Sequence, residues 1–87
     1  MENDHIVKEI RQFIRQQFNV PDTDPDFNDD VHLFDYGYVD SFGAVNLTTF
    51  VETKFSIKIN QSDMIVYPLN TVREIATFTA KRQKGEL

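Results

Sequence analysis

Three segments of the chain repeat apolar residues at spacings of three and four, the pattern of helices that bury one face. These segments cover residues 4–18, 41–55 and 71–83. The 87-residue chain has no cysteine, so neither a disulfide nor a thiolate metal site can staple its small core. Eight phenylalanines within an apolar fraction of 40% still supply a genuine core. These features predict an all-α fold, a small four-helix bundle forming one domain over residues 1–87.

The first segment, residues 4–18, is expected to form a helix with its apolar residues on one side. Those residues are Ile6, Val7, Ile10, Phe13, Ile14 and Phe18. Pro21 ends the helix, because proline disfavours helical geometry in the residue before it. Residues 19–40 then form a long loop, in which two prolines and several aspartates favour turns. Four side chains are expected to pin the loop to the core: Phe27, Val31, Leu33 and Phe34.

The two C-terminal helices have recognisable start signals. Asn60 is a helix-capping residue with a carboxylate three positions later, which predicts a short helix over 61–66. The last helix, over 71–83, begins at Thr71-x-x-Glu74, the pattern of a capping box. Between the helices, residues 56–59 are expected to form an extended connector. The predicted order is a helix, a long loop, a helix, a short helix and a final helix.

The chain is acidic, with a formal net charge of −5. This charge disfavours binding to nucleic acid or to an anionic membrane surface, both of which require basic patches. No apolar stretch approaches the roughly 20 residues that span a bilayer. The acidic N-terminus, Met1–Asp4, lacks the apolar run of a signal peptide. We therefore expect a soluble, cytoplasmic monomer that docks onto other proteins.

The acidic stretch 22–26 resembles the start of an EF-hand calcium loop. The glycine and the bidentate glutamate that such a loop needs are replaced by Phe27 and Leu33, so we expect no calcium site. His5 and His32 lie far apart in the sequence, and no cysteine accompanies either. We expect no other metal site.

Ser41 lies where the acidic loop meets the start of the second helix. Its hydroxyl can cap the helix by accepting a hydrogen bond from an early backbone N–H. Alternatively, it is exposed and receives a phosphate-linked group, because a helix N-terminus favours an anion. The surrounding sequence is not the Gly-x-Ser-x-Gly turn of a hydrolase, and the chain is too small for a complete catalytic site. We therefore expect no catalytic residue and no enzyme activity.

The motif Gly37-x-x-Asp40-Ser41-Phe42 resembles the attachment site of the acyl carrier protein family, and the predicted helix order fits that family along the whole chain. The resemblance implies that Ser41 carries 4′-phosphopantetheine, transferred from coenzyme A by a phosphopantetheinyl transferase. The thiol of this cofactor would hold acyl or aminoacyl groups as thioesters. Further partners implied are an acyl- or aminoacyl-loading adenylation or ligase enzyme and downstream transferases or synthases.

The resemblance also assigns roles to individual residues. Asp40 matches the aspartate before the modified serine. The positions expected to bind partner enzymes are Phe42, Val45, Thr49, Ile65 and Val66, of which Ile65 and Val66 would also help line the acyl pocket.

Two features separate the chain from carriers of the fatty acid synthase type. Its second helix has one acidic residue, Glu52, and two residues separate Gly37 from the Asp-Ser pair. In both respects the chain looks closer to the D-alanyl carrier protein and to stand-alone carriers of specialised pathways. The alternative from another class is an unmodified helical interaction domain in which Ser41 acts only as an N-cap.

Overall fold

The computed structural model describes residues 3–87, so Met1 and Glu2 of the acidic N-terminus lie outside the described residues. The described residues form four helices and no strand. The helices are α1 (Asp4–Gln17), α2 (Ser41–Phe55), α3 (Gln61–Val66) and α4 (Val72–Gln83). The predicted all-α class is therefore confirmed, and each helix boundary lies within one residue of its predicted position.

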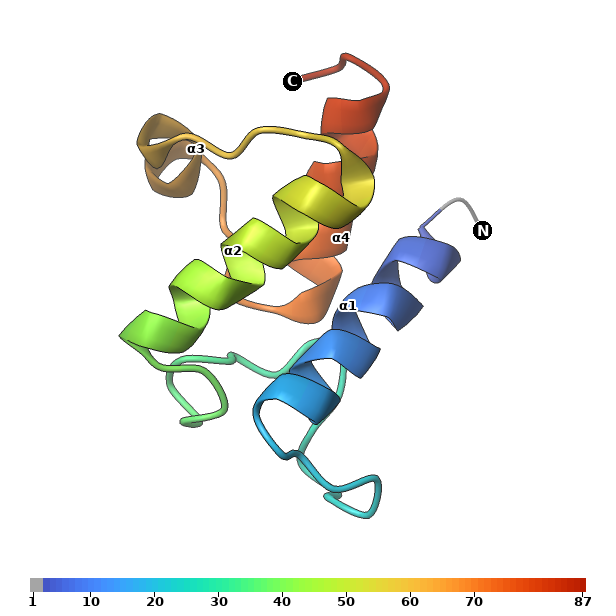
Figure 1. The fold of residues 1–87 in the computed structure, drawn as a ribbon, viewed down its shortest axis with the longest axis vertical. Helices are drawn as coiled ribbons and strands as arrows, with labels where there is room; N and C mark the ends of the chain where they lie inside the picture. Colours follow the sequence, from blue (N-terminus) through green and yellow to red (C-terminus); the bar gives the residue numbers. More distant parts are fainter. Residues whose placement is uncertain (1–2) are drawn as a thin grey trace.

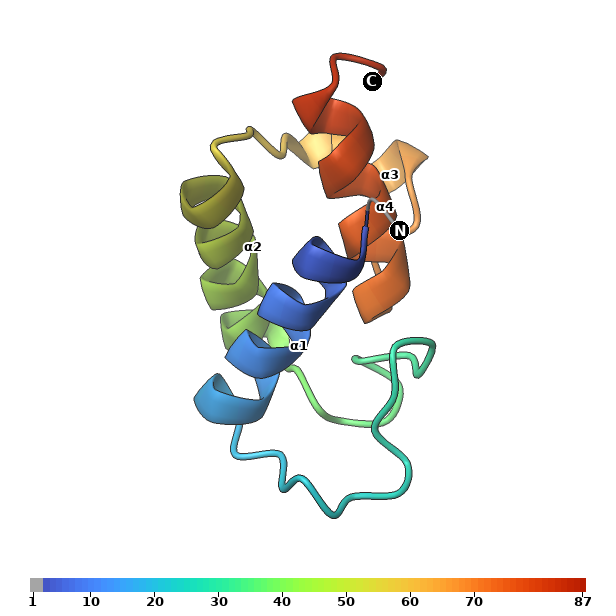
Figure 2. The ribbon, with the colours of Figure 1, turned by 90° about the vertical axis from the view of Figure 1, so that its right-hand side faces the viewer.

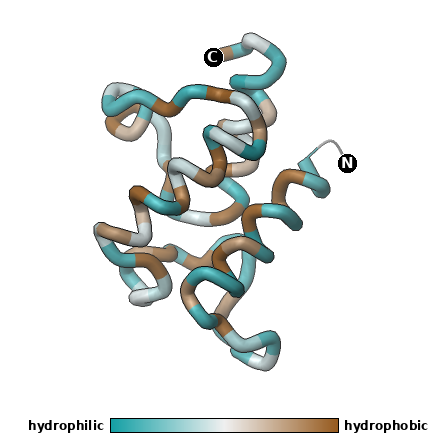
Figure 3. Tube along the Cα trace, viewed as in Figure 1, coloured by the Kyte–Doolittle hydropathy of each residue, from teal (hydrophilic) through white to brown (hydrophobic). Residues whose placement is uncertain are grey.

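Helices α1, α2 and α4 pack on one another around the core (Figure 2). The short α3 stands apart from these three helices in Figure 1, and a side-chain hydrogen bond links it to α4. Apolar and polar stretches alternate along α1 (Figure 3), because its apolar residues recur once per turn. The buried residues of α1 are Ile6, Val7, Ile10 and Ile14. They meet Leu47, Val51 and Phe55 of α2 and the apolar face of α4 in one continuous core.

The loop over residues 19–40 crosses the end of the bundle opposite α3 (Figure 1). Phe27, Val31 and Leu33 are buried as predicted. The prediction for Phe34 is wrong, because its side chain is 37% exposed, and the buried Val39 anchors the end of the loop instead. Polar contacts add to these anchors.

The guanidinium of Arg11 donates two hydrogen bonds to the carboxylate of Asp29, at 2.9 and 2.8 Å. Arg73 of α4 binds Asp30 at 2.7 Å, and its backbone N–H donates to Asp29 O. Both loop aspartates are therefore tied to helices, which holds a long loop in one conformation.

The predicted start signals of α3 and α4 are both used. Asp63 accepts a hydrogen bond from Asn60 N–H at 2.8 Å. Thr71 is the N-cap of α4, and its hydroxyl accepts from Glu74 N–H at 3.0 Å. The carboxylate of Glu74 reaches back one residue further than in a standard capping box, to Asn70 N–H.

Candidate functional site

A tight turn delivers the chain to the start of α2. The carbonyl of Leu33 accepts hydrogen bonds from the N–H groups of both Tyr38 and Val39, at 2.9 and 3.1 Å. This reversal passes through Gly37, whose φ of +78° is in the left-handed region that glycine adopts without steric cost. Asp40 therefore enters the helix from a fixed position.

Asp40, and not Ser41, is the N-cap of α2. Its carboxylate accepts a hydrogen bond from Gly43 N–H at 2.7 Å, and its backbone is extended, as a cap requires. Ser41 is already the first helical residue, with an exposed side chain. Within residues 3–87, its hydroxyl has no hydrogen-bond partner. The interpretation of Ser41 as an N-cap is therefore wrong, because the preceding carboxylate occupies that role.

Gly43 allows the first turn of α2 to pack directly against the end of α1. A Cβ atom at this position would lie 2.6 Å from Cε1 of Phe18 and 3.1 Å from Cγ1 of Val39. Glycine lowers helix propensity by about 1 kcal/mol relative to alanine. The close contact with Phe18 explains why this position is a glycine. The contact also holds the first turn of α2, and with it Ser41, in a fixed position.

The first turn of α2 retains donors for an anionic group. In the described part of the chain, neither Ser41 N–H nor Phe42 N–H has a protein acceptor. Unpaired N–H groups and the helix dipole attract negative charge to such a position. The exposed hydroxyl of Ser41 and these donors together fit a phosphate-linked substituent.

The expected partner-binding residues do not all lie together. Phe42 and Val45 are 85% and 65% exposed on α2, and Ile65 and Val66 are largely exposed on α3. Thr49 is exposed on a different side of α2, where it lines a shallow groove with Phe13 of α1 and Phe50.

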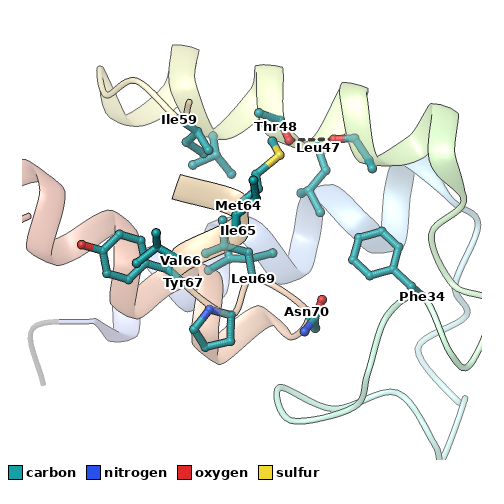
Figure 4. Close-up of a pocket in the computed structure, with 14 residues that line it drawn as sticks. Phe34, Leu47, Thr48, Ile59, Met64, Ile65, Val66, Tyr67, Leu69 and Asn70 are labelled. Carbon is teal, nitrogen blue, oxygen red and sulfur yellow. Dashed lines mark hydrogen bonds between the residues drawn. The ribbon is translucent and has the colours of Figure 1, made fainter. Parts of the chain in front are cut away.

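A cavity of about 500 Å³ lies between α2, α3 and the segment that leads into α4 (Figure 4). Ile65 and Val66 line it, as the resemblance implies. Sequence reasoning missed most of its other walls, which come from separate segments. These include Phe34 of the long loop, Met64 of α3, and Leu69 and Asn70 before α4.

The cavity is apolar in character. None of its lining residues is charged, and the hydroxyl of Thr48 is occupied by a hydrogen bond to Ala44 O at 2.8 Å. Apolar groups entering the cavity would leave water, whereas a charged group there would find no counterion in its walls.

The acidic stretch 22–26 makes structural hydrogen bonds. Asp24 accepts from the N–H of Asp26 at 2.9 Å and from the hydroxyl of Tyr38 at 3.0 Å. Across residues 3–87, no three His, Cys, Asp or Glu side chains are grouped so that they could hold a metal ion. No helix in the described residues has the length and apolar character needed to cross a membrane.

Comparison with known families identifies the class of protein. A family model described as the phosphopantetheine attachment site matches residues 8–79, which include the whole of α2 and α3. The chain therefore belongs to the phosphopantetheine-attachment family. No curated protein and no solved structure gave a significant match.

Members of this family are carriers with a covalently attached 4′-phosphopantetheine group, and partner enzymes perform the catalysis. The residues at the start of α2 fit such a group, because they combine an exposed hydroxyl with unpaired backbone donors. The chain is thus a phosphopantetheine carrier protein and not an enzyme.

Proposed function

We propose that Ser41 is the attachment residue, and that the protein holds acyl groups on its phosphopantetheine arm and presents them to partner enzymes. The observation that carries this proposal is the position of Ser41. Its hydroxyl is exposed at the first residue of α2 and free of hydrogen bonds among the described residues, while Asp40 caps the helix. An interaction domain that used Ser41 only as a cap would not leave this hydroxyl free.

Each neighbouring residue has a part in this function. Asp40 fixes the start of α2, and the N–H groups of Ser41 and Phe42 are available to the phosphate oxygens. Gly43 allows the first turn of α2 to pack against Phe18. The bound group supplies a terminal thiol that carries acyl groups as thioesters. The protein itself supplies the attachment point, the cavity and the recognition surface.

The direct test is to incubate the protein with a broad-specificity phosphopantetheinyl transferase and coenzyme A. We expect a single phosphopantetheinyl adduct by mass spectrometry. Trypsin should release residues 16–54 as one peptide, in which Ser41 is the sole serine. An adduct on the peptides that contain Ser56 or Ser62, or no adduct at all, would contradict the assignment.

We infer that the cargo is an uncharged acyl group and not an aminoacyl group. The walls of the α2–α3 cavity carry no charge, and burying an unpaired ammonium group in such a site is costly. Among the two subtypes that the motif resembles, this favours stand-alone carriers of specialised pathways over D-alanyl carriers.

The cargo prediction can be checked by loading the protein from hexanoyl- or glycyl-coenzyme A and recording methyl NMR spectra. Hexanoyl loading should shift the methyl resonances of Leu47, Val51 and Ile75, which line the cavity. Glycyl loading should leave these resonances unchanged. The methyl resonances of Ile6, which is buried elsewhere in the core, should not shift with either cargo. Equal shifts with both cargoes would argue against a preference for uncharged groups.

We propose that partner enzymes dock on the exposed apolar residues in the first half of α2 and in α3, namely Phe42, Val45, Ile65 and Val66. These partners are the transferase, an acyl-loading enzyme and downstream transferases or synthases. Thr49 faces a different side of α2 and lies outside this surface. Glu52, the one carboxylate of α2, accepts a hydrogen bond from Ile59 N–H at 2.8 Å and is half-buried. Charge on α2 therefore contributes little to docking.

The rate of phosphopantetheinyl transfer tests this docking surface. Phe42→Ala and Val45→Asp should lower kcat/KM by at least about tenfold, because we place both residues among the few central anchors that each contribute more than about 1.4 kcal/mol to an interface. Glu52→Gln keeps an acceptor for Ile59 and should have little effect. Raising the salt from about 0.05 to about 0.5 M should change the wild-type rate only mildly, because salt screens charges and not apolar contacts. A steep fall with salt, with Glu52→Gln as the slowest variant, would show that docking depends on charge.

A further inference from the structure

Helix α3 is attached to the bundle in an unusual way. The other three helices bury apolar faces, but the buried residue of α3 is the charged Asp63, which is 8% exposed. Its apolar residues Met64, Ile65 and Val66 are 48%, 85% and 67% exposed and line the cavity. The apolar residues within α3 itself therefore contribute little to holding this helix in place.

Two pairs of side chains join α3 to α4 instead. The guanidinium of Arg82 donates to the carboxylate of Asp63 at 2.8 Å. Directly after α3, the ring of Tyr67 lies 5.4 Å from the ring of Phe78, measured between centroids. Phe78 and Arg82 are four positions apart in α4, so both pairs use the same face of α4. The guanidinium of Arg82 also lies 4.9 Å from the centroid of the Phe78 ring, which links the two pairs.

Asp63 is fixed from both sides. One carboxylate oxygen accepts from Asn60 N–H and the other from Arg82. The bond from Asn60 lowers the pKa of Asp63 against the opposing effect of burial, and Arg82 lowers this pKa further. Asp63 is therefore ionised at neutral pH, and Arg82 is its cationic partner.

The Asp63–Arg82 pair is better suited to fixing geometry than to adding stability. Among the described residues, Arg82 Nε is buried and has no hydrogen-bond acceptor. The pair is partly buried, with side chains 21% and 11% exposed. An ion pair withdrawn from water that leaves a donor unpaired is commonly no more stabilising than an apolar contact of the same size, although loss of one partner is costly. Its directional hydrogen bonds do, however, select one position of the attached helix.

We propose that Arg82 is a positioning residue, which sets the place of α3 through Asp63 and thereby holds Met64, Ile65 and Val66 as one wall of the cargo cavity. The role of this wall in sheltering cargo rests on the proposed function. The position of α3 does not, so it can be tested on the unmodified protein.

The chain offers a convenient probe, because Met64 and Met1 are its two methionines. A spectrum of the wild-type protein labelled with [methyl-¹³C]methionine should therefore contain two resonances. Arg82→Met and Arg73→Met each add a third resonance, and adding Met64→Leu to each protein identifies the Met64 resonance by its loss. Arg82→Met should shift and broaden the Met64 resonance, and should speed amide exchange over residues 64–67 by at least about tenfold, which corresponds to about 1.4 kcal/mol. Asp63→Asn keeps an acceptor for Asn60 N–H and should have the same effect. Arg82→Lys, which retains the charge, should restore most of the wild-type behaviour.

Arg73→Met provides the matched control. Arg73 is the other arginine of α4 that pairs with an aspartate, but its partner Asp30 lies in the long loop. This variant should leave the Met64 resonance and the exchange of residues 64–67 unchanged. In the hexanoyl-loaded protein, hydroxylamine should cleave the thioester faster in Arg82→Met than in the wild type or in Arg73→Met.

Three results would overturn the inference. The first is an unchanged Met64 resonance in both Arg82→Met and Asp63→Asn. The second is equally accelerated exchange in α2, which would indicate general unfolding. The third is a wild-type rate of thioester cleavage in Arg82→Met. If no adduct forms on any variant, the proposed function fails, whereas the Met64 measurement still decides how α3 is held.

Discussion

Ser41→Ala is expected to abolish the phosphopantetheinyl adduct while leaving the free energy of unfolding within about 0.5 kcal/mol of the wild-type value. The first effect follows from loss of the only hydroxyl that the proposal places at the attachment site. The second follows from the exposed side chain of Ser41, which makes no hydrogen bond in residues 3–87. Mass spectrometry after incubation with transferase and coenzyme A measures the first effect, and urea denaturation measures the second.

Asp40→Ala is the matched control for this experiment. It removes the carboxylate that caps α2 and should lower the free energy of unfolding by about 1 kcal/mol. The Ser41 hydroxyl remains, so an adduct should still form, although more slowly because the helix start is less well fixed. A stability loss in Ser41→Ala as large as that in Asp40→Ala would contradict the assigned cap.

Phe55→Ala is expected to lower the free energy of unfolding by roughly 3–5 kcal/mol. Phe55 is 7% exposed at the end of α2 and belongs to the same buried cluster as Ile10, Ile14 and Ile75. Its ring also lies edge-on to Phe50, with 6.3 Å between the centroids. Domains have total stabilities of about 5–15 kcal/mol, so this loss would remove a large part of the stability of a protein of this size. Urea or thermal denaturation followed by circular dichroism would measure it.

Phe42→Ala makes the same truncation on the same helix at a site that is 85% exposed. Its free energy of unfolding should change by no more than about 0.5 kcal/mol, because the ring removed is already in water. Equal losses in the two variants would mean that the face of α2 assigned to the core is not the one that is buried.

The positions of the helices were predictable because their signals are local. The spacing of apolar residues identified α1, α2 and α4, and the capping residues Asn60 and Thr71 located the starts of α3 and α4. Each signal depends on residues a few positions apart, which a sequence displays directly. The same holds for the Asp40-Ser41 motif, which indicated the family before any fold was known.

The choice between Asp40 and Ser41 as the cap was not decided by the sequence. Both residue types cap helices well, and they are adjacent. The turn through Gly37 and the burial of Val39 place Asp40 in the extended geometry of a cap, and Ser41 becomes the first residue of the helix. A backbone path set by packing thus left the serine free.

By itself, the sequence determined the all-helical class, the order and bounds of the helices, and the phosphopantetheine-attachment family, because these depend on periodicity, caps and a contiguous motif. Tertiary structure alone decided what depends on distant residues. In the folded protein Phe34 lines the cavity, Gly43 packs against Phe18, and Asp63 pairs with Arg82, which is 19 positions away in the sequence. From the sequence, Arg82 was simply one cation near the end of a helix. Its partner Asp63 is set by the tertiary structure, since contacts between distant residues are fixed by how the whole chain packs and not by any local pattern.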